Sequence, residues 1–391
     1  MKNVVGILKD LISLPSINPR LGKDLPADLI GESRVARYVE DFVRGIGLDV
    51  IVQEIGQPGR YNVGGALLRG KDRKTIVLQS HMDTVGIQSA PELLTPMERD
   101  GLIHGRGACD DKGGLAAMLA ALAIAAKSPE LVRNNVIVMA VAGEEIAFEG
   151  SLALVEQAPT AGADFGLVGE PTSCRIVTGC KGVARWKIET TGVSCHSAHP
   201  EQGINAIYRM GKILALVEDY QRELSRIVDD RLGAETVSVG TIHGGTAANV
   251  VPDRCEIEID RRLTRHTSPE GARQAVGRYL RERGIDFELG MSDLTDAQPA
   301  AVVDDSHPGV RLLADASRRL GLDPDSRVAA YTSDANRMNA AGIPTILWGP
   351  GSVDAAHTQE ESVPIAELET AVEFYRCVIQ ADRLESYRGC E

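Results

Sequence analysis

The chain has 391 residues, a length that allows two or three domains, and its hydrophobic fraction of 43% is that of a globular protein. Its 42 basic and 55 acidic residues leave a net charge of −13. This balance argues against nucleic acid as a partner, because phosphate recognition needs clustered lysine and arginine.

The N-terminal residues and the cysteines bear on location. Lys9 and Asp10 interrupt the first apolar run too early for a signal peptide, and no segment approaches the length of a transmembrane helix. The seven cysteines are scattered and include no CxxC pair. We therefore expect reduced thiols, a cytoplasmic location and no membrane partner.

The first part of the chain alternates between apolar strands and helices. The pattern predicts helices over 4–12, 31–43, 115–126 and 151–157, and strands over 49–54, 62–68, 75–80, 136–142 and 164–169. The later strands of this set are apolar throughout, which is typical of a mostly parallel sheet covered on both faces. Helix 115–126 is apolar on all sides, which predicts a buried helix.

The pattern then changes. Alternating apolar and polar residues predict half-exposed strands over 184–190, 237–242 and 255–260, with helices over 204–217 and from 268, and a short last strand over 286–289. The order strand, helix, strand, strand, helix, strand is typical of an α+β sandwich of ferredoxin-like type. Buried-strand character returns near Asp304, the run over 344–348 leads into Gly349-Pro350-Gly351, and the final helix covers 365–381.

These patterns predict an α/β protein with a mixed, mostly parallel sheet flanked by helices. An α+β domain of ferredoxin-like type interrupts it. We expect the two parts of the main domain at 1–180 and 293–391, and the inserted domain at 181–292.

Two adjacent glutamates, Glu144 and Glu145, follow the buried strand that Gly143 ends. Ligands of open α/β sheets bind at the carboxyl ends of the strands. Two carboxylates there repel each other and are poorly solvated, so the pair needs a cation or a proton. The alternative is an exposed loop pair that water solvates.

Acidic or histidine residues also stand just past other strand ends or in glycine-rich turns. With the second glutamate, the set is His81, Asp110, Glu145, Glu170 and His357. Each alone is a weak signal, because a single histidine or aspartate in such a place is commonly structural. Together, two imidazoles and three carboxylates form a donor set suited to zinc, and one carboxylate can bridge two ions.

The motifs around these residues resemble those of one enzyme family, the dinuclear zinc amidohydrolases and peptidases. The family includes acetylornithine deacetylase, succinyl-diaminopimelate desuccinylase, aminoacylase and carboxypeptidase G. The resemblance covers nearly the whole chain. It rests on His81-x-Asp83, Gly105-Arg106-Gly107-x-x-Asp110-x-Lys112-Gly113, Gly143-Glu144-Glu145, Gly169-Glu170-Pro171-Thr172 and Gly349-Pro350-Gly351…Ala356-His357.

The resemblance implies two zinc ions per subunit, which cobalt or manganese can replace. By this resemblance, one zinc takes His81 and Glu170, and the other takes Glu145 and His357. Asp110 is implied to bridge the two ions.

The resemblance also implies roles for residues that are not ligands. Asp110 is preferred to Asp111 because the family's aspartate stands two residues before Lys-Gly. Asp83 matches the carboxylate that orients the His81 ring. Glu144 remains as the general base, which moves a proton from water to the leaving nitrogen.

The inserted domain matches the family's lid. His196 matches the histidine that reaches the partner subunit's site and stabilises the tetrahedral oxyanion, which implies a homodimer through the lid domain. Asn249 and Arg262 match positions that bind the substrate carboxylate, for which a guanidinium is suited. Gly351 is implied to bind substrate as well, whereas we expect Arg261 to form a surface salt bridge.

The activity that the resemblance implies is hydrolysis of the amide bond of an N-acyl amino acid. Segments 331–335 and 349–357 are most similar to the acetylornithine deacetylase and desuccinylase branch. A carboxypeptidase or dipeptidase of the same family, which would take a dipeptide or peptide, is the first alternative. The second is an inactive relative that only binds ligands, but such a protein should have lost a ligand or the base, and all are present.

Overall fold

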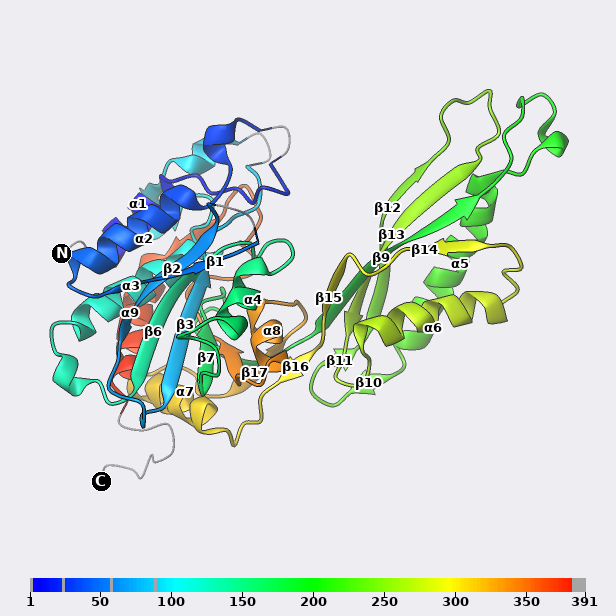
Figure 1. The fold of residues 1–391 in the computed structure, drawn as a ribbon. Coiled ribbons are helices and arrows are strands. Elements are labelled where there is room, and N and C mark those ends of the chain that lie inside the picture. Colours follow the sequence, from blue (N-terminus) through cyan, green and yellow to red (C-terminus); the bar gives the residue numbers. More distant parts are fainter. Residues whose placement is uncertain (1–2, 23–24, 57–58, 88–89, 382–391) are drawn as a thin grey trace. The chain divides into compact units, whose positions relative to one another are not determined.

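The computed structural model describes residues 3–22, 25–56, 59–87 and 90–381, and the chain divides into two compact units (Figure 1). The first takes in the described residues of Met1–Thr178, Val303–Arg327 and Ser333–Glu391. The second takes in Gly179–Val302 and Val328–Thr332. The expected boundary at 292 falls inside the second unit, because β15 (Asp296–Gln298) pairs with β9 (Gly182–Thr191).

Among the described residues, the main sheet has nine strands, in the order β1-β2-β6-β3-β7-β18-β8-β16, with β17 also paired to β8. The strands are β1 (Val50–Glu54), β2 (Tyr61–Leu67), β3 (Thr75–His81), β6 (Asn135–Val141), β7 (Phe165–Val168), β8 (Ile176–Cys180), β16 (Ala301–Val302), β17 (Ser326–Ala329) and β18 (Thr345–Leu347). The pairs β6–β3, β3–β7 and β7–β18 are parallel, whereas β1, β2, β8 and β16 add antiparallel pairs on either side. The predicted α/β class is confirmed, with a sheet that is parallel at its centre.

Helices cover both faces of this sheet. They are α1 (Val4–Ile12), α2 (Ser33–Gly45), α3 (Lys112–Ala125), α4 (Glu149–Glu156), α7 (Pro308–Arg319), α8 (Asp334–Ala340) and α9 (Ile365–Ile379), with short turns η1 (Ala27–Leu29), η2 (Pro91–Leu94) and η3 (Pro129–Leu131). Alternate residues of β6 enter different cores: Val138 packs with α1, α3 and α9, and Met139 packs with α4 and α8. All seven residues of β6 are therefore buried, which explains why its sequence does not alternate.

Helix α3 is the buried helix that the sequence predicts, although it begins three residues earlier, at Lys112. Thirteen of its fourteen residues are buried. The buried Lys112 ammonium donates hydrogen bonds to the carbonyls of Leu11 and Leu14, each at 2.9 Å. These bonds satisfy a charge that burial would otherwise make costly, and they fix the helix start directly after Asp110 and Asp111. A separate three-stranded sheet, β19-β5-β4, consists of β4 (Met97–Arg99), β5 (Leu102–His104) and β19 (Ser362–Pro364).

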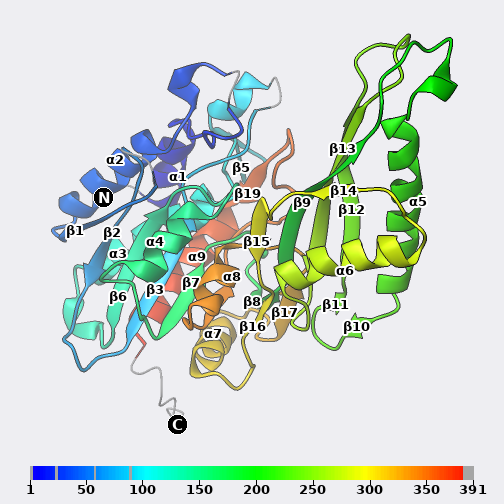
Figure 2. The same cartoon turned by 45° about the vertical axis from the view of Figure 1, so that its right-hand side comes forward.

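The second unit is an antiparallel sheet with helices against it (Figure 2). Its elements are β9, β12 (Thr236–Gly244), β13 (Arg254–Leu263), β14 (Leu289–Met291), β15, the hairpin β10 (Val228–Asp229) and β11 (Gly233–Ala234), α5 (Ala206–Leu224), α6 (Pro269–Glu282) and η4 (Pro200–Gln202). The sheet order is β12-β13-β9-β14, and the main elements follow the predicted sequence of strands and helices. The last strand, expected over 286–289, begins only at Leu289, where pairing with Thr190 starts. Among the described residues no helix, α5 included, has the length and apolarity to cross a membrane.

Candidate metal centre

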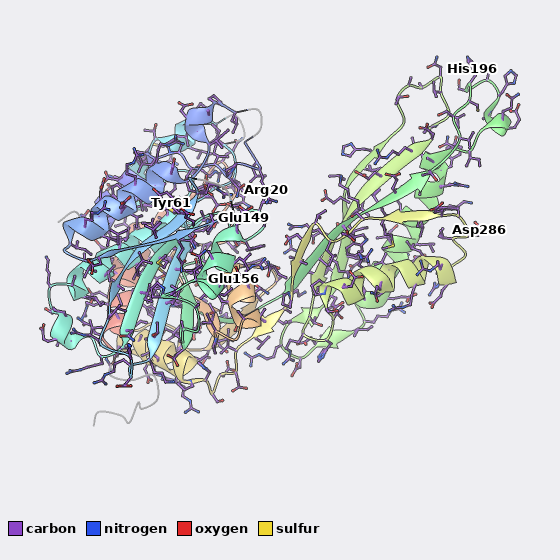
Figure 3. All side chains as sticks on the ribbon, in the orientation of Figure 1. Arg20, Tyr61, Glu149, Glu156, His196 and Asp286 are labelled. Atoms are coloured by element: carbon purple, nitrogen blue, oxygen red, sulfur yellow. The ribbon has the colours of Figure 1, made fainter. Side chains whose placement is uncertain are left out.

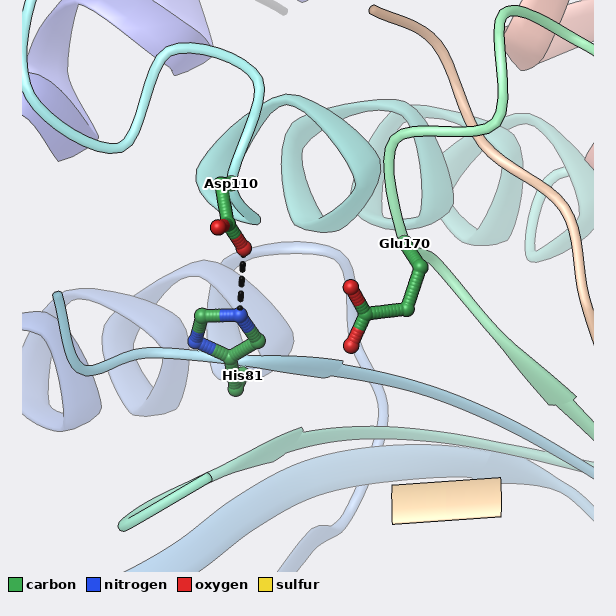
Figure 4. Close-up of side chains that lie close together, drawn as sticks. All are labelled: His81, Asp110 and Glu170. Atoms are coloured by element: carbon green, nitrogen blue, oxygen red, sulfur yellow. Dashed lines mark hydrogen bonds and ion pairs between the residues drawn. The ribbon is translucent and has the colours of Figure 1, made fainter. Parts of the chain in front are cut away.

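Three side chains meet at the carboxyl ends of β3 and β7 (Figure 4). His81 ends β3, Glu170 follows β7, and Asp110 precedes α3. His81 Nε2 lies 2.9 Å from Asp110 Oδ1, and one ligand atom from each of the three residues lies within 4.8 Å of the others. Glu170 is 6% exposed, and within the described part of the chain its Oε1 atom has no hydrogen-bond partner. A buried carboxylate oxygen without a partner is a position that a cation would satisfy.

A second cluster shares Asp110 with the first. Asp110 Oδ2 lies 3.1 Å from His357 Nε2, and the same nitrogen lies 3.2 Å from Glu145 Oε2. Asp110, Glu145 and His357 therefore form another group of possible metal ligands. The structure thus brings together all five residues that the sequence marks as ligands, in two groups joined by one carboxylate. Their role as ligands stays a prediction.

The electrostatics of both clusters favour positive charge. Burial raises the pKa of Glu170, and the nearby Asp110 charge raises it further. Hydrogen bonds to Asp110 and Glu145 raise the pKa of His357 to about 10. Burial lowers the pKa of His81, but the bond to Asp110 and the surrounding carboxylates outweigh it and raise the pKa overall. Carboxylates that resist ionisation beside imidazoles that hold protons mark a site where a divalent cation can replace those protons.

The orientation of His81 suits metal binding. Its Nδ1 atom lies 2.8 Å from the backbone carbonyl of Asp83, so Nε2 is the nitrogen that faces Asp110. A histidine ligand is commonly held in this way, with one nitrogen donating to a carbonyl and the other left for the metal. The donor set, two imidazoles and three carboxylates, is the chemistry that zinc prefers.

The family resemblance implies that the Asp83 carboxylate orients the His81 ring, but in the structure this carboxylate has other partners. Its Oδ1 atom lies 3.7 Å from His81 Nδ1, beyond hydrogen-bond distance. The carboxylate instead accepts backbone N–H groups at 2.8, 3.0 and 3.1 Å from Gly143, Glu144 and Glu145, respectively. The Asp83 backbone carbonyl thus contacts the ring of His81, and its carboxylate holds the turn that carries both glutamates.

The structure separates residues that are adjacent in sequence. Within the described residues, neither cluster includes Glu144 or Asp111. Asp111 is fully buried and accepts a hydrogen bond from Ser80 Oγ at 2.7 Å. Burial and the Glu170 charge raise the pKa of Glu144 well above its ordinary value. The adjacent pairs therefore supply one cluster member each, Asp110 and Glu145.

Three further predicted site residues lie in the second unit. His196 is exposed in a loop at one end of that unit's sheet (Figure 3). The backbone N–H of Ser197 donates to the carbonyl of Asn249 at 3.1 Å, so the loops of His196 and Asn249 are neighbours. Arg262 is half-buried on β13, and its Nε atom donates to Asp260 at 2.9 Å. The roles of these residues in substrate binding and catalysis stay predictions.

Gly351, predicted to bind substrate, is in the first unit and has a backbone reason to be glycine. Its φ is +84°, and a Cβ atom there would lie 2.5 Å from the Cβ of Cys109. Gly351 therefore lets the loop after β18 pass close to the residue before Asp110. Its role in binding substrate stays a prediction.

Arg261 is not the surface residue that the sequence suggests. It is 2% exposed, pairs with Glu235, and donates to the hydroxyl of Tyr220 at 3.1 Å. The expectation was wrong because β13 alternates, and Arg261 falls on the same inward face as Ile257 and Ile259.

Two buried residues that the sequence analysis did not single out support the Asp110 loop. Glu361 Oε1 accepts the backbone N–H of Asp110 at 3.2 Å, and Glu361 pairs with Arg106. Arg106 lies inside the Gly105–Gly107 motif and Glu361 follows shortly after His357. Closeness to these motif residues is the only feature of the sequence that points to Arg106 and Glu361, because a charged residue type does not indicate burial.

Two clusters of carboxylates and imidazoles beside the parallel strand ends of a sheet are typical of metal-dependent hydrolases. The model of Peptidase family M20/M25/M40 matches residues 77–381, and the chain belongs to this family. Its members are hydrolases of amide and peptide bonds that depend on metal, so the chain is an enzyme of that kind.

Similar proteins include deacylases and a peptidase. A Mycobacterium tuberculosis protein, named provisionally as a succinyl-diaminopimelate desuccinylase, DapE, is 31% identical over 90% of this chain and 94% of its own. An acetylornithine deacetylase of Myxococcus xanthus is 31% identical over 76% of this chain and 78% of its own. The crystal structure of a tripeptidase from Staphylococcus aureus has a TM-score of 0.78 at 23% identity, covering 96% of this chain and 97% of that one, which shows the shared fold.

Asp83→Asn should weaken metal binding at least about tenfold, the lower end of the 10–100-fold cost of losing a side chain that supports ligands. The reason is that the amide cannot accept all three N–H groups of the Gly143–Glu145 turn. Zinc titration of metal-stripped protein by calorimetry measures the effect. Asn18→Ala, which removes one donor to Asp83 and none to the turn, should cost less. Unchanged zinc affinity in Asp83→Asn would show that the turn is held by other contacts.

Proposed function

We propose that the protein hydrolyses the amide bond of an N-acyl amino acid, next to the substrate's free carboxylate, in the cytoplasm. The observation that carries this proposal is the pair of clusters that share Asp110, with the half-buried Glu144 outside both. Two relatives at 31% identity, named as a desuccinylase and a deacetylase, support the substrate class. The fold likeness to a tripeptidase at 23% identity does not favour a peptide substrate over an acyl amino acid.

Two divalent ions are part of the proposal, zinc in the first place, with cobalt or manganese as possible substitutes. His81, Asp110 and Glu170 would hold one ion, and Asp110, Glu145 and His357 the other. Bound there, the ions would polarise the substrate carbonyl and make water a better nucleophile. The full set of ligands argues against an inactive relative that only binds ligands.

Glu144 is proposed as the general base. It accepts a proton from the attacking water and returns that proton to the leaving nitrogen. Burial and the neighbouring Glu170 charge raise the pKa of its carboxyl group, which makes the carboxylate a stronger base toward water. Asp83 positions Glu144 through the backbone of the turn.

Residues beyond the clusters would bind the rest of the substrate. We assign Arg262 and Asn249 to the substrate carboxylate, because a guanidinium and an amide can both donate to it. Gly351 would contribute backbone rather than side-chain contacts. In this structure the Arg262 guanidinium pairs with Asp260, so carboxylate binding has to compete with, or add to, that ion pair.

A panel of substrates tests the proposal. N-acetyl, N-succinyl and N-formyl amino acids, with dipeptides beside them, should show faster hydrolysis of the acyl amino acids. A chelator should abolish this hydrolysis, and added zinc should restore it.

Amide counterparts without the free carboxylate should react slowly. Arg262→Ala should lose about tenfold or more in kcat/KM, and only on substrates with a free carboxylate. Arg185→Ala, which also removes a partner of Asp260, is the matched control. Faster cleavage of dipeptides, or activity in metal-free protein, would contradict the proposal.

Glu144→Gln and Glu145→Gln should fail in different ways. The first should lose nearly all turnover and keep its metal, because Glu144 lies outside both clusters. The second should lose metal from the cluster of Asp110, Glu145 and His357. Elemental analysis beside turnover on the same samples separates the two effects. Equal metal loss in both variants would mean that the roles of the two glutamates are assigned wrongly.

A homodimer formed through the second unit, which would act as a lid, is also part of the proposal. Strand β12 ends the sheet order, so its outer edge is available for another strand. Exposed apolar side chains lie on it or on the start of α5 beside it: Ile242 at 50%, Ile207 at 38% and Tyr208 at 75%. Such an apolar edge is typical of a protein interface. In such a dimer, His196 would donate to the oxyanion in the partner's site.

Mixed dimers of Glu144→Ala and His196→Ala should recover part of the activity that each variant lacks alone. One of the two sites in such a dimer combines an intact Glu144 with an intact His196 from the other chain. Co-expression with two affinity tags, followed by turnover assays on the doubly purified species, measures the recovery. Verified mixed dimers that stay inactive while binding metal would show that His196 does not act across subunits. An active wild-type monomer would exclude the composite site altogether.

A further inference from the structure

Arg106 and Glu361 form an ion pair that is almost completely buried in the first unit. Arg106 is 2% exposed and Glu361 is 1% exposed. Taking two charges out of water costs free energy that the pair itself often fails to recover, and an apolar pair of similar size is commonly no less stable. Stability alone is therefore a weak reason for this pair, and the remaining contacts of both side chains show what else it does.

Glu361 contacts the backbone that carries Asp110. Its Oε1 atom accepts the N–H groups of Cys109 and Asp110, each at 3.2 Å, while Oε2 pairs with Arg106. A carboxylate that accepts two successive N–H groups fixes the direction of that stretch of chain, and hydrogen bonds to a charged acceptor are stronger than neutral ones.

Arg106 contacts the other loop of the same cluster. Its Nη2 atom donates to the backbone carbonyl of Thr358 at 3.2 Å, one residue after His357. The backbone N–H of Gly105 also donates to the Glu361 carbonyl at 3.1 Å, which extends the pairing of β5 with β19. The ion pair thus joins the loop of Asp110 to the loop of His357, two segments that are 255 positions apart at the paired residues.

The two clusters depend on this connection to different degrees. His81 ends a strand at the centre of the sheet and is 1% exposed, so the sheet itself fixes it. His357 is in a loop, its side chain is 52% exposed, and its φ of +63° is a conformation that side chains rarely adopt. Only the cluster of Asp110, Glu145 and His357 therefore needs the loop at 357 to be held at the right distance from Asp110.

We propose that Arg106 and Glu361 are positioning residues for the second of the two metal ions, the one that His357 would bind. This inference rests on the proposed function as a two-metal hydrolase. The pair fixes the 3.1 Å approach of His357 to Asp110. The ion that His81 and Glu170 would hold depends on the pair through Asp110 alone, whereas the ion that His357 would bind depends on it through both loops.

Glu361→Gln is the sharpest test. Glutamine has one oxygen, so it can accept from Arg106 or from the N–H groups of Cys109 and Asp110, and the connection fails at one end. Zinc titration of metal-stripped protein should give a first ion within about threefold of wild type. The second ion should bind at least about tenfold more weakly. His357→Ala provides the reference for a protein that keeps only the first ion.

Glu235→Gln is the matched control, because Glu235 is also buried, pairs with Arg261, and accepts a backbone N–H from Thr264 in the second unit. It should bind both ions as wild type does. Thermal unfolding of the metal-free proteins checks that each variant is folded. If Glu361→Gln does not fold, Arg106→Met with Glu361→Leu replaces the pair by apolar side chains, and the same loss of the second ion is expected.

Two results would overturn the inference: wild-type affinity for both ions in a folded variant, or equal weakening of both ions. The second result would mean that the pair supports the whole site. Failure of the two-metal assignment on which the inference rests is distinguishable, because wild-type protein would then not bind two zinc ions. Failure of the inference alone leaves wild type with two ions.

Discussion

The Asp110 carboxylate lies between two imidazoles, and the rest of the site is arranged around it. Each of its oxygens contacts one histidine, His81 at 2.9 Å and His357 at 3.1 Å. Burial raises the pKa of Asp110, but the hydrogen bonds from the histidines outweigh burial and lower the pKa overall. Asp110 is therefore the carboxylate of the site that stays ionised most readily, whereas Glu144, Glu145 and Glu170 resist ionisation.

That arrangement requires a rigid sheet beneath it. Helices cover both faces of the central strands, so successive residues of β3 and β6 are buried in turn on either side. Strands enclosed in this way cannot shift register without moving a whole apolar face, and their ends therefore hold fixed positions. The buried helix α3 likewise fixes the position of Asp110, because the helix begins two residues after it, at Lys112.

Local patterns in the sequence were sufficient for the central strands, for most of the longer helices and for the residues just past the strand ends. Helices α7 and α8 and the strands β4, β5 and β8 were not predicted. Apolar runs without alternation identify central strands, and parallel strands put their carboxyl ends on one edge, so His81, Glu170 and the adjacent pair Glu144 and Glu145 follow from pattern alone. Choosing Asp110 over Asp111 needed the family resemblance, because two adjacent aspartates are equivalent by pattern. The structure gives the physical difference: Asp111 bonds to Ser80, and Asp110 faces the histidines.

Local sequence patterns did not predict contacts between segments that are far apart in the chain. The burial of Arg106, Glu361 and Arg261 depends on which segments cover them, and a charged residue type predicts exposure. For Arg261 the alternation of β13 carried the information, since it puts the residue on the inward face. For Glu361 no periodic pattern exists, because its partners in the Asp110 loop are joined to it only through the folded chain.

Asp83 and Glu361 each hold the backbone of one loop beside the clusters through a buried carboxylate. Loops at strand ends lack a ladder of hydrogen bonds, and here some adopt strained backbone: Ala147, Phe148, Ser173, Cys174 and His357 all have positive φ. Asp83 accepts three successive N–H groups from the turn of Glu144 and Glu145, and Glu361 accepts two from the loop of Asp110. Each is a buried carboxylate that is in neither cluster and acts on the cluster through backbone, in the way that a helix cap satisfies orphaned N–H groups. Because every residue type except proline has a backbone N–H group, this arrangement leaves the side chains of these turns available for the proposed metal binding and proton transfer.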